Sequence, residues 1–561
     1  MQFNRKLVSL FWSVVVLAIL VLTWIGLEKA YPDIAAIRYL PDRLFRLVKT
    51  LMGNDPLGSG LEAPAVPWEL IAAKLLVTLV LIRGLMKIVG SVFRDNVTQL
   101  RAALKRRHTI IVGAGRKGRS IATDLREQHG EKAVIIEQQS AHKSSADLRR
   151  AGHLVLAGDA TSKAMLRSAG ALKARQVICF ARDQKTGIQV AGRLRELWSA
   201  PSAADDNGCD CYVHLDNPRL VDVFLGHDGA HTQAVRLHFF NLQRMMARSL
   251  FARLPQELGP VLQDGSVRKL RVDLIGFSLP GQAILLQGLR VLHLGLEHGV
   301  EWHVWVDANA CSAAREQLVA SHPLADRVAD IRFHGVDAQY RALLDAQAGE
   351  GDGTLCLVIC ALDDDDASMA AAAEILHATP TGNFPVFARC EDSSGLATLL
   401  SGSSQRLKLF GNVQELCTVE MICGELQDRM AQAIHADYLQ LVQETAGESS
   451  AYKTPWAALN EDARDANRAQ ADHLPYKRML AGGDVSQIDE QGLEFLAMIE
   501  HQRWAAHRYL NGWRFGPERD DERRLHPSLL PWAELSDGER EKDRDAVRRL
   551  GQIQTLGKVV G

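Results

Sequence analysis

The chain has 561 residues, of which 47% are hydrophobic and 24% are charged, and its formal net charge is −2. This composition indicates several folded domains and excludes an intrinsically disordered protein. The balanced charge gives no general attraction to nucleic acid, so no nucleic-acid partner is expected. Of the nine cysteines, only Cys209 and Cys211 lie close together, and one intervening residue is too few for a zinc knuckle. We therefore expect reduced, buried thiols and no metal site.

Two apolar stretches open the chain. Leu7–Leu27 carries no charge and is long enough to cross a bilayer at about 1.5 Å per residue. The second stretch, 66–89, is interrupted by Glu69, Lys74, Arg83 and Lys87, so it predicts either a second span or an amphipathic helix at the interface. Basic residues crowd the segment 94–107 that follows, which favours the cytoplasmic side. The sequence thus predicts a two-pass protein of the inner (cell) membrane with most of the chain in the cytoplasm.

A glycine-rich turn follows the basic segment. Gly113, Gly115 and Gly118 have the spacing G-x-G-x-x-G between an apolar strand and a helix. Such glycines permit a tight turn and close approach of a pyrophosphate, and the helix amino terminus attracts its charge. Glu137 lies about twenty residues further on, at the end of a second strand, where a carboxylate can accept ribose hydroxyls. The combination predicts binding of NAD(H) or an adenine nucleotide.

Short apolar strands alternate with helices through the cytoplasmic part, which predicts an α/β fold with doubly wound parallel sheets. The pattern occurs twice, and the second copy begins with the strand 270–275 and the loop Gly276–Gly281. We therefore predict tandem Rossmann-like domains. The second loop lacks the middle glycine and carries Pro280 instead, so a structural or dimerising role is at least as expected there as nucleotide binding.

Residues 108–250 resemble the Trk/RCK nucleotide-binding domains that regulate potassium channels and transporters. The resemblance rests on the three glycines, on Glu137, on the turn 158–161 and on Asp183. It implies a site for NAD(H) or an adenine nucleotide whose occupancy is passed to a membrane partner. The loop 50–54 between the apolar stretches has no potassium-filter sequence, so a conventional channel is not expected. The expected cofactor-binding residues are Gly113, Gly115, Arg116, Gly118, Glu137, Asp159, Ala160 and Asp183.

From residue 450 the sequence is rich in charges and tryptophan and is similar to the RyR repeat of ryanodine receptors. The resemblance implies a mainly α-helical module, and by analogy a ligand-sensing role. Glu500 and Trp504 share one helical face, which allows two interpretations: a satisfied core network, or a pocket in which tryptophan stacks a base and arginine meets phosphate. The pocket would hold a small nucleotide-derived ligand. Its candidate residues are Glu500, His501, Arg503, Trp504, Trp513 and Arg514.

Between these blocks, 415–443 has mostly helical apolar spacing and predicts a core or dimerisation helix. Two thin spans cannot enclose a pathway alone, so we expect a homo-oligomer, dimeric or a higher cyclic assembly. The predicted division is a membrane region at 1–107 (spans 7–27 and 66–89), Rossmann-like domains at 108–250 and 251–414, a linker helix at 415–449 and an RyR-like domain at 450–561.

Together these features predict a membrane-anchored, nucleotide-sensing regulatory protein that controls ion flux or acts as a ligand-gated membrane effector, as in immunity. No catalytic residue is expected. The alternative is a membrane-tethered NAD-dependent oxidoreductase, which would need an acid or base beside the nicotinamide. Residues 150–220 contain no Tyr-x-x-x-Lys pair or comparable signature, so the regulatory interpretation is preferred.

Overall fold

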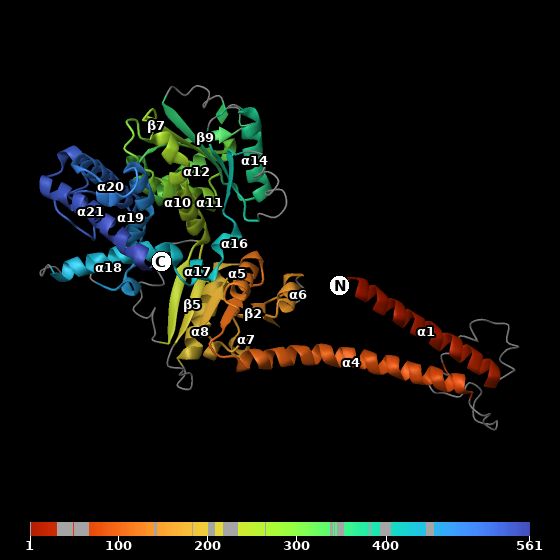
Figure 1. Cartoon of the computed structure of the whole chain (residues 1–561). Coiled ribbons are helices and arrows are strands. Elements are labelled where there is room, and N and C mark those ends of the chain that lie inside the picture. Colours follow the sequence, from red (N-terminus) through yellow and green to blue (C-terminus); the bar gives the residue numbers. More distant parts are fainter. Residues whose placement is uncertain are drawn as a thin grey trace. The chain divides into compact units, whose positions relative to one another are not determined.

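The computed structural model (Figure 1) describes residues 2–30, 49, 67–139, 143–181, 183–199, 208–216, 234–263, 265–336, 340, 343–344, 353–380, 382, 384–392, 405–444 and 454–560. Inside the helices, the side chains of 2–11, 13, 30, 87–95, 441–444 and 551–560 are outside this description. The chain divides into two compact units, Met1–Arg101 and Ala102–Gly561, and each is described by itself.

The first unit is an antiparallel pair of long helices, α1 (Gln2–Ala30) and the first part of α4 (Trp68–Leu104). Lys29 near the end of α1 bonds Glu69 near the start of α4, and the Arg83 guanidinium lies 4.0 Å from the ring centre of Trp12. Glu69 and Arg83, two of the four charged residues in the second apolar stretch, therefore have partners on the first helix.

The predicted spans 7–27 and 66–89 lie on these two helices. Residue 66 and the side chains of 7–11, 13 and 87–89 are outside the description. Among the described residues, no helix is both long and apolar enough to cross a membrane. Exposed apolar side chains nevertheless follow both helices. They are Val14, Val16, Leu17, Leu20, Val21 and Ile25 on α1, and Trp68, Ile71, Leu75, Leu79, Leu81, Ile82, Leu85 and Met86 on α4.

The first sheet has six parallel strands in the order β3-β2-β1-β4-β5-β6. Its strands are β1 (Thr109–Val112), β2 (Val134–Glu137), β3 (Leu154–Ala157), β4 (Gln176–Cys179), β5 (Cys209–His214) and β6 (Val235–Phe240). Its helices are α5 (Arg116–Glu127), α6 (Lys143–Arg150), α7 (Lys163–Ser168) and α8 (Gln184–Trp198). All four residues of β1 are buried, as expected of a central parallel strand.

The second sheet repeats this order as β9-β8-β7-β10-β11-β12, again all parallel. Its strands are β7 (Lys269–Ile275), β8 (Val300–Asp307), β9 (Asp330–Val336), β10 (Thr354–Cys360), β11 (Val386–Arg389) and β12 (Leu407–Phe410). Its helices are α11 (Leu279–Val291), α12 (Cys311–Ser321) and α14 (Asp365–Ala378). The prediction of two doubly wound sheets is confirmed. The sequence pattern did not identify the outer strands β6, β9 and β12.

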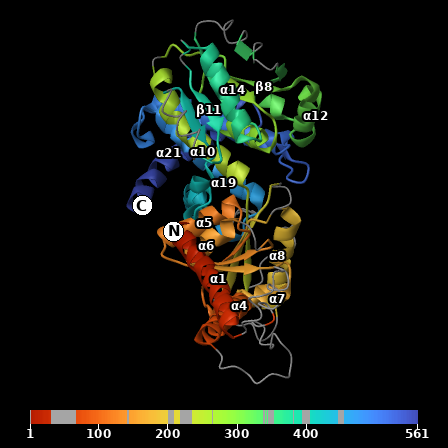
Figure 2. The same cartoon turned by 90° about the vertical axis from the view of Figure 1, so that its right-hand side faces the viewer.

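One long helix, α10 (Leu242–Leu262), connects β6 of the first sheet to β7 of the second. The carboxy-terminal region is helical, as predicted, with α18 (Arg429–Glu444), α19 (Glu461–Leu480), α20 (Glu490–Leu510) and α21 (Asp537–Val560). Helix α19 packs against α10 (Figure 2). It also packs against α18 and α20. The strands β13 (Arg514–Phe515) and β14 (Leu525–His526) form a small ladder beside these helices.

The segment 415–443 is not one helix. It is divided into α16 (Val413–Leu416), α17 (Val419–Ile422), the 3-10 turn η4 (Leu426–Asp428) and α18. Thr418 caps α17 through a bond from Met421 N, and Glu425 has a φ of 45°, a left-handed conformation that a continuous helix excludes. The apolar residues of the predicted stripe consequently pack into two different cores. Leu416 and Ile422 belong to the Rossmann core, whereas Ile434 belongs to the carboxy-terminal core.

Candidate functional site

The first glycine loop has the backbone of a phosphate-binding turn. Gly113 has a φ of +97°, and a Cβ there would lie 2.7 Å from the carbonyl oxygen of Phe180. A Cβ at Gly118 would lie 1.9 Å from the carbonyl oxygen of Gly113. Both positions therefore require glycine, the first for the turn and the second for the packing of α5 on β1.

Gly115 differs from the other two glycines of the loop, Gly113 and Gly118. It is the amino-terminal cap of α5, with an ordinary φ of −63°, and a Cβ there would meet nothing within 4 Å. The fold itself thus does not require glycine at this position. The open space lies at the amino terminus of a 12-residue helix, where backbone N–H groups and the helix dipole favour an anion.

The loop lies at the point where the strand order reverses. β1 pairs with β2 on one side and with β4 on the other, and Val112 is opposite Cys179 at their carboxyl ends. In open α/β sheets, ligands bind in the crevice outside the carboxyl ends of the strands at such a switch point. The glycine loop therefore occupies the expected binding position of a doubly wound sheet.

Glu137 lies beside this loop, but its carboxylate already has backbone partners. Ala114 N donates to Oε2 at 2.6 Å and Gln139 N donates to Oε1 at 3.1 Å. The side chain therefore fixes the glycine loop against the end of β2. Each oxygen keeps a second acceptor position, so the expected ribose contact is compatible with this geometry and remains a prediction.

The other predicted residues hold local turns. Asp159 accepts hydrogen bonds from Thr161 N at 2.9 Å and Thr161 Oγ1 at 2.8 Å, and Ala160 beside it is buried. Asp183 caps α8 by accepting from Thr186 N at 2.7 Å. The bond from the Thr186 backbone lowers the pKa of Asp183. Both aspartates are thus used in shaping the carboxyl ends of β3 and β4.

Arg116 and His214 lie at the same edge of the first sheet, after β1 and at the end of β5. Arg116 begins α5 and is 58% exposed, and its Nη2 lies 3.4 Å from Oε2 of Glu391 in the second domain. His214 ends β5 and is buried, with no hydrogen-bond partner for Nε2 among the described residues. Burial, together with the nearby Lys117 ammonium, lowers the pKa of His214 to about 4. Sequence motifs gave no signal for Glu391 or His214.

The second glycine loop repeats the backbone of the first but has a serine at the position of the middle glycine. Gly276 has a φ of +96°, and a Cβ at Gly281 would lie 2.2 Å from the carbonyl oxygen of Gly276. Ser278, with a φ of −70°, caps α11 at the position that Gly115 has in the first loop, so Pro280 is not the residue that replaces the middle glycine. Phe277 is buried against Phe333 at a ring distance of 5.2 Å. Phe277 thus packs this loop against β9 of its own domain.

In the carboxy-terminal module, Glu500 belongs to a buried network. It bonds Lys477 and accepts from Arg503, with Nε–Oε2 at 3.0 Å and Nη2–Oε1 at 2.8 Å. All three side chains are buried. Although burial opposes ionisation, Arg503 and Lys477 hold the pKa of Glu500 well below its ordinary value. This geometry supports the interpretation of Glu500 and Arg503 as a satisfied core network.

Next to this network lies a group that we call the aromatic–arginine group: Trp504, Arg508, Trp513 and His526. The Arg508 guanidinium is 4.5 Å from the ring centre of Trp513 and 5.7 Å from that of Trp504, and the Trp504 and His526 rings are 4.8 Å apart. Arg508 Nε is buried without a hydrogen-bond partner among the described residues. Arg514 lies on β13, where its side chain is exposed. The arginine between the tryptophans is therefore Arg508, which the sequence analysis did not select.

His501 on α20 forms hydrogen bonds with α21 and with the segment before it. Its Nδ1 is 3.2 Å from Asp543 Oδ2 on α21 and its Nε2 is 2.9 Å from the carbonyl oxygen of Leu530. Both partners are acceptors, so the charged imidazole satisfies both bonds. Burial disfavours that charge, but the Asp543 and Leu530 contacts outweigh it and raise the pKa of His501.

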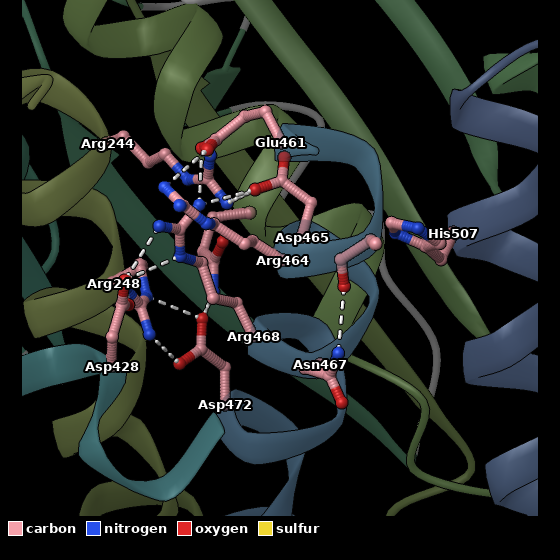
Figure 3. Close-up of polar contacts among 12 residues, drawn as sticks. Arg244, Arg248, Asp428, Glu461, Arg464, Asp465, Asn467, Arg468, Asp472 and His507 are labelled. Atoms are coloured by element: carbon pink, nitrogen blue, oxygen red, sulfur yellow. Dashed lines mark hydrogen bonds and ion pairs between the residues drawn. The ribbon is translucent and has the colours of Figure 1, made fainter. Parts of the chain in front are cut away.

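A larger ion-pair network joins α19 to α10 and η4 (Figure 3). Arg248 on α10 contacts Asp428 at 2.6 Å and Asp472 at 2.8 Å. Arg468 on α19 contacts Asp428 at 2.7 Å and Asp465 at 2.8 Å. Each of these arginines pairs with more than one carboxylate. The ion pairs therefore join α19 of the RyR-like region to α10, the helix that connects the two Rossmann-like sheets.

The sheet topology and the loop define a protein with tandem dinucleotide-binding-type folds. Residues 109–205 match the TrkA-N domain and residues 480–560 match the RyR domain. The chain thus contains a TrkA-N domain and an RyR domain, which confirms both resemblances found in the sequence.

No curated protein matches the chain. Among solved structures, GsuK bound to ADP is similar with a TM-score of 0.38 and 15% identity, over 74% of this chain and 96% of that chain. The GsuK channel bound to NAD is similar with a TM-score of 0.38 and 13% identity, over 74% of this chain and 82% of that chain.

Proposed function

We propose that this protein is a nucleotide-sensing regulator, not an enzyme, whose first glycine loop binds NAD(H) or an adenine nucleotide. The observation that carries the proposal is the open position at Gly115. It lies between two glycines that the backbone requires, at a helix amino terminus and at the switch point of a parallel sheet. Glu137 holds the loop in place and has acceptor positions left for ribose hydroxyls.

The test is a calorimetric titration of the full-length protein in detergent with NAD⁺, NADH and ADP. Gly115→Val adds a Cβ with no protein atom within 4 Å, and its side chain occupies the space expected for the pyrophosphate, so the binding should be lost while the fold is kept. Gly192→Val is the matched control, because a Cβ there also meets nothing within 4 Å and Gly192 is an exposed position of α8. Equal binding by wild type and Gly115→Val would contradict the assignment. Gly281→Val is unsuitable as a control because its Cβ would collide with backbone.

The RyR domain supplies the second sensing site in this proposal, for a small anionic, nucleotide-derived ligand. What supports it is the aromatic–arginine group, in which a guanidinium lies between two indole faces and keeps an unused, buried Nε donor. Aromatic faces stack bases and arginine suits phosphate. Arg508 takes the phosphate-binding role in this proposal that the sequence assigned to Arg503 or Arg514.

Membrane attachment through α1 and α4 completes the proposed function, with occupancy of the nucleotide sites controlling ion flux or a membrane effector. The support is the row of exposed apolar side chains on both helices, several of them more than half exposed. Membranes isolated from expressing cells should keep the protein after washing with high salt and with alkaline carbonate. Release by carbonate would indicate a helix lying at the interface, and recovery in the soluble fraction would contradict attachment.

Homo-oligomerisation is also proposed, as a dimer or a higher cyclic assembly. Leu416, Ile422 and Ile434 of the broken segment 413–444 pack within the chain, so the proposed interface is assigned to the first Rossmann-like domain alone. Mass photometry in detergent that finds only particles of about the monomer mass of 61.8 kDa would contradict it.

A further inference from the structure

The second Rossmann-like domain places a carboxylate at the entrance of the first glycine loop. Arg116 is the first residue of α5, next to the open position at Gly115, and Glu391 follows β11 of the second sheet. Their side chains are 3.4 Å apart, Nη2 to Oε2. The residue nearest to the expected phosphate position is therefore already paired with a group from another domain.

Glu391 is held firmly by its own domain. Its Oε1 is bonded by the buried Arg389, its N–H donates to Asp365 Oδ2 at 2.9 Å, and its carbonyl accepts from Val413 N at 3.0 Å. Its side chain is only 20% exposed. The position of this carboxylate is consequently set by the second domain. The ion pair itself contributes little to stability, because Arg116 is 58% exposed.

A fixed carboxylate beside a phosphate-binding loop acts on the charge of the ligand. It repels added negative charge and occupies the guanidinium that would otherwise compensate it. A terminal phosphoryl group such as the β-phosphate of ADP has a second ionisation and carries about 1.5 to 2 negative charges near neutral pH. The two phosphates of a dinucleotide are both internal and have no second ionisation. The carboxylate therefore disfavours ADP and ATP more than it disfavours NAD(H).

We propose that Glu391 determines the charge preference of the first nucleotide site, so that a dinucleotide is favoured over nucleotides with a terminal phosphate. The proposal rests on the nucleotide site proposed above. It makes the specificity of the first domain depend on contact with the second, because movement of the segment 389–391 away from α5 would remove the repulsion.

The experiment compares the affinities of NAD⁺ and ADP for the full-length protein by calorimetry. Glu391→Gln removes the charge and keeps the size, and it should strengthen ADP binding by about tenfold with a change of less than about threefold for NAD⁺. Glu415→Gln is the matched control. Glu415 lies on the following segment, and its exposed ion pair with Arg253 is outside the glycine loop, so neither affinity should change.

A second variant keeps the test informative if Glu391→Gln is unstable in thermal melting. Arg116→Gln leaves the Glu391 charge uncompensated, so the affinity for ADP should fall further than that for NAD⁺. The ratio of the two affinities therefore moves in opposite directions in the two variants. Equal shifts for both ligands, or no shift, would overturn the proposal. Absence of binding by the wild type would overturn the proposed nucleotide site itself and this inference with it.

Discussion

At the scale of single residues, the two candidate sites differ in how their polar groups are used. Glu137, Asp159 and Asp183 accept backbone hydrogen bonds that shape the ends of the strands. The carboxylate of Glu500 is paired with Arg503 and with Lys477. Arg508 Nε and His214 Nε2, by contrast, are buried atoms without hydrogen-bond partners among the described residues. Such atoms carry a desolvation cost that a ligand can relieve.

Arg508 provides the residue-scale prediction. Arg508→Ala should weaken binding of a nucleotide-derived anion to the RyR domain by about tenfold or more, because stacking and the charged hydrogen bond are lost together. Arg514→Ala should have little effect, since Arg514 is exposed on β13. Fluorescence titration of the tryptophans with a panel of mono-, di- and cyclic nucleotides measures both variants. Loss of binding in Arg514→Ala with retention in Arg508→Ala would restore the assignment made from the sequence.

At the scale of secondary-structure elements, α5 connects the nucleotide loop to the second domain along its length. Arg116 faces Glu391 at its start, Ser120 Oγ donates to the carbonyl oxygen of Val413 at 3.3 Å, and Asp124 accepts from Val419 N at 2.8 Å. The helices α16 and α17 lie beside it in Figure 1. A displacement of α5 by a bound pyrophosphate would therefore act directly on the segment that leads into α18.

The contact between α20 and α21 gives a pH-dependent prediction. The pKa of His501 lies above its ordinary value of 6.5 in the folded protein. The contribution of its charged form to stability is therefore complete below about pH 6.5 and disappears as the pH rises through the folded-state pKa. Between pH 6 and pH 8, the thermal midpoint of the wild type should fall relative to that of His501→Gln, which cannot titrate. Parallel midpoints across this range would contradict the raised pKa of His501.

At the scale of the whole second unit, the ion-pair network predicts cooperative unfolding of the RyR domain with the Rossmann-like domains. Arg468→Met would leave Asp428 and Asp465 with fewer partners in a buried setting, which should cost about 3–5 kcal/mol. Arg548→Met removes pairs that lie on the surface of α21 and should cost less than about 1 kcal/mol. Chemical denaturation followed by tryptophan fluorescence measures both. A separate early transition in the wild type would contradict the cooperative coupling.

Much of this architecture was predictable from local patterns. The buried strands β1, β4 and β10 contain short apolar runs, and the glycine spacing in the first loop depends on backbone geometry within six residues. The duplication and both matched domains were recognised for the same reason, since each has its signal within a short stretch. The outer strand β9 was missed because Asp330–Val336 alternates charged and apolar residues at a sheet edge and has no continuous apolar run.

The sequence by itself determined the elements whose formation depends on neighbouring residues: the parallel strands, the glycine turns and the helical carboxy-terminal region. Only the tertiary structure decided the partners of the charged side chains. It separated the segment 413–444 into two packing units, gave Arg508 rather than Arg514 to the tryptophans, and brought Glu391 to Arg116 across 275 positions of sequence. The physical reason is that the partner of a buried or paired charge depends on which element packs beside it in the folded chain. Sequence periodicity carries no information about that packing.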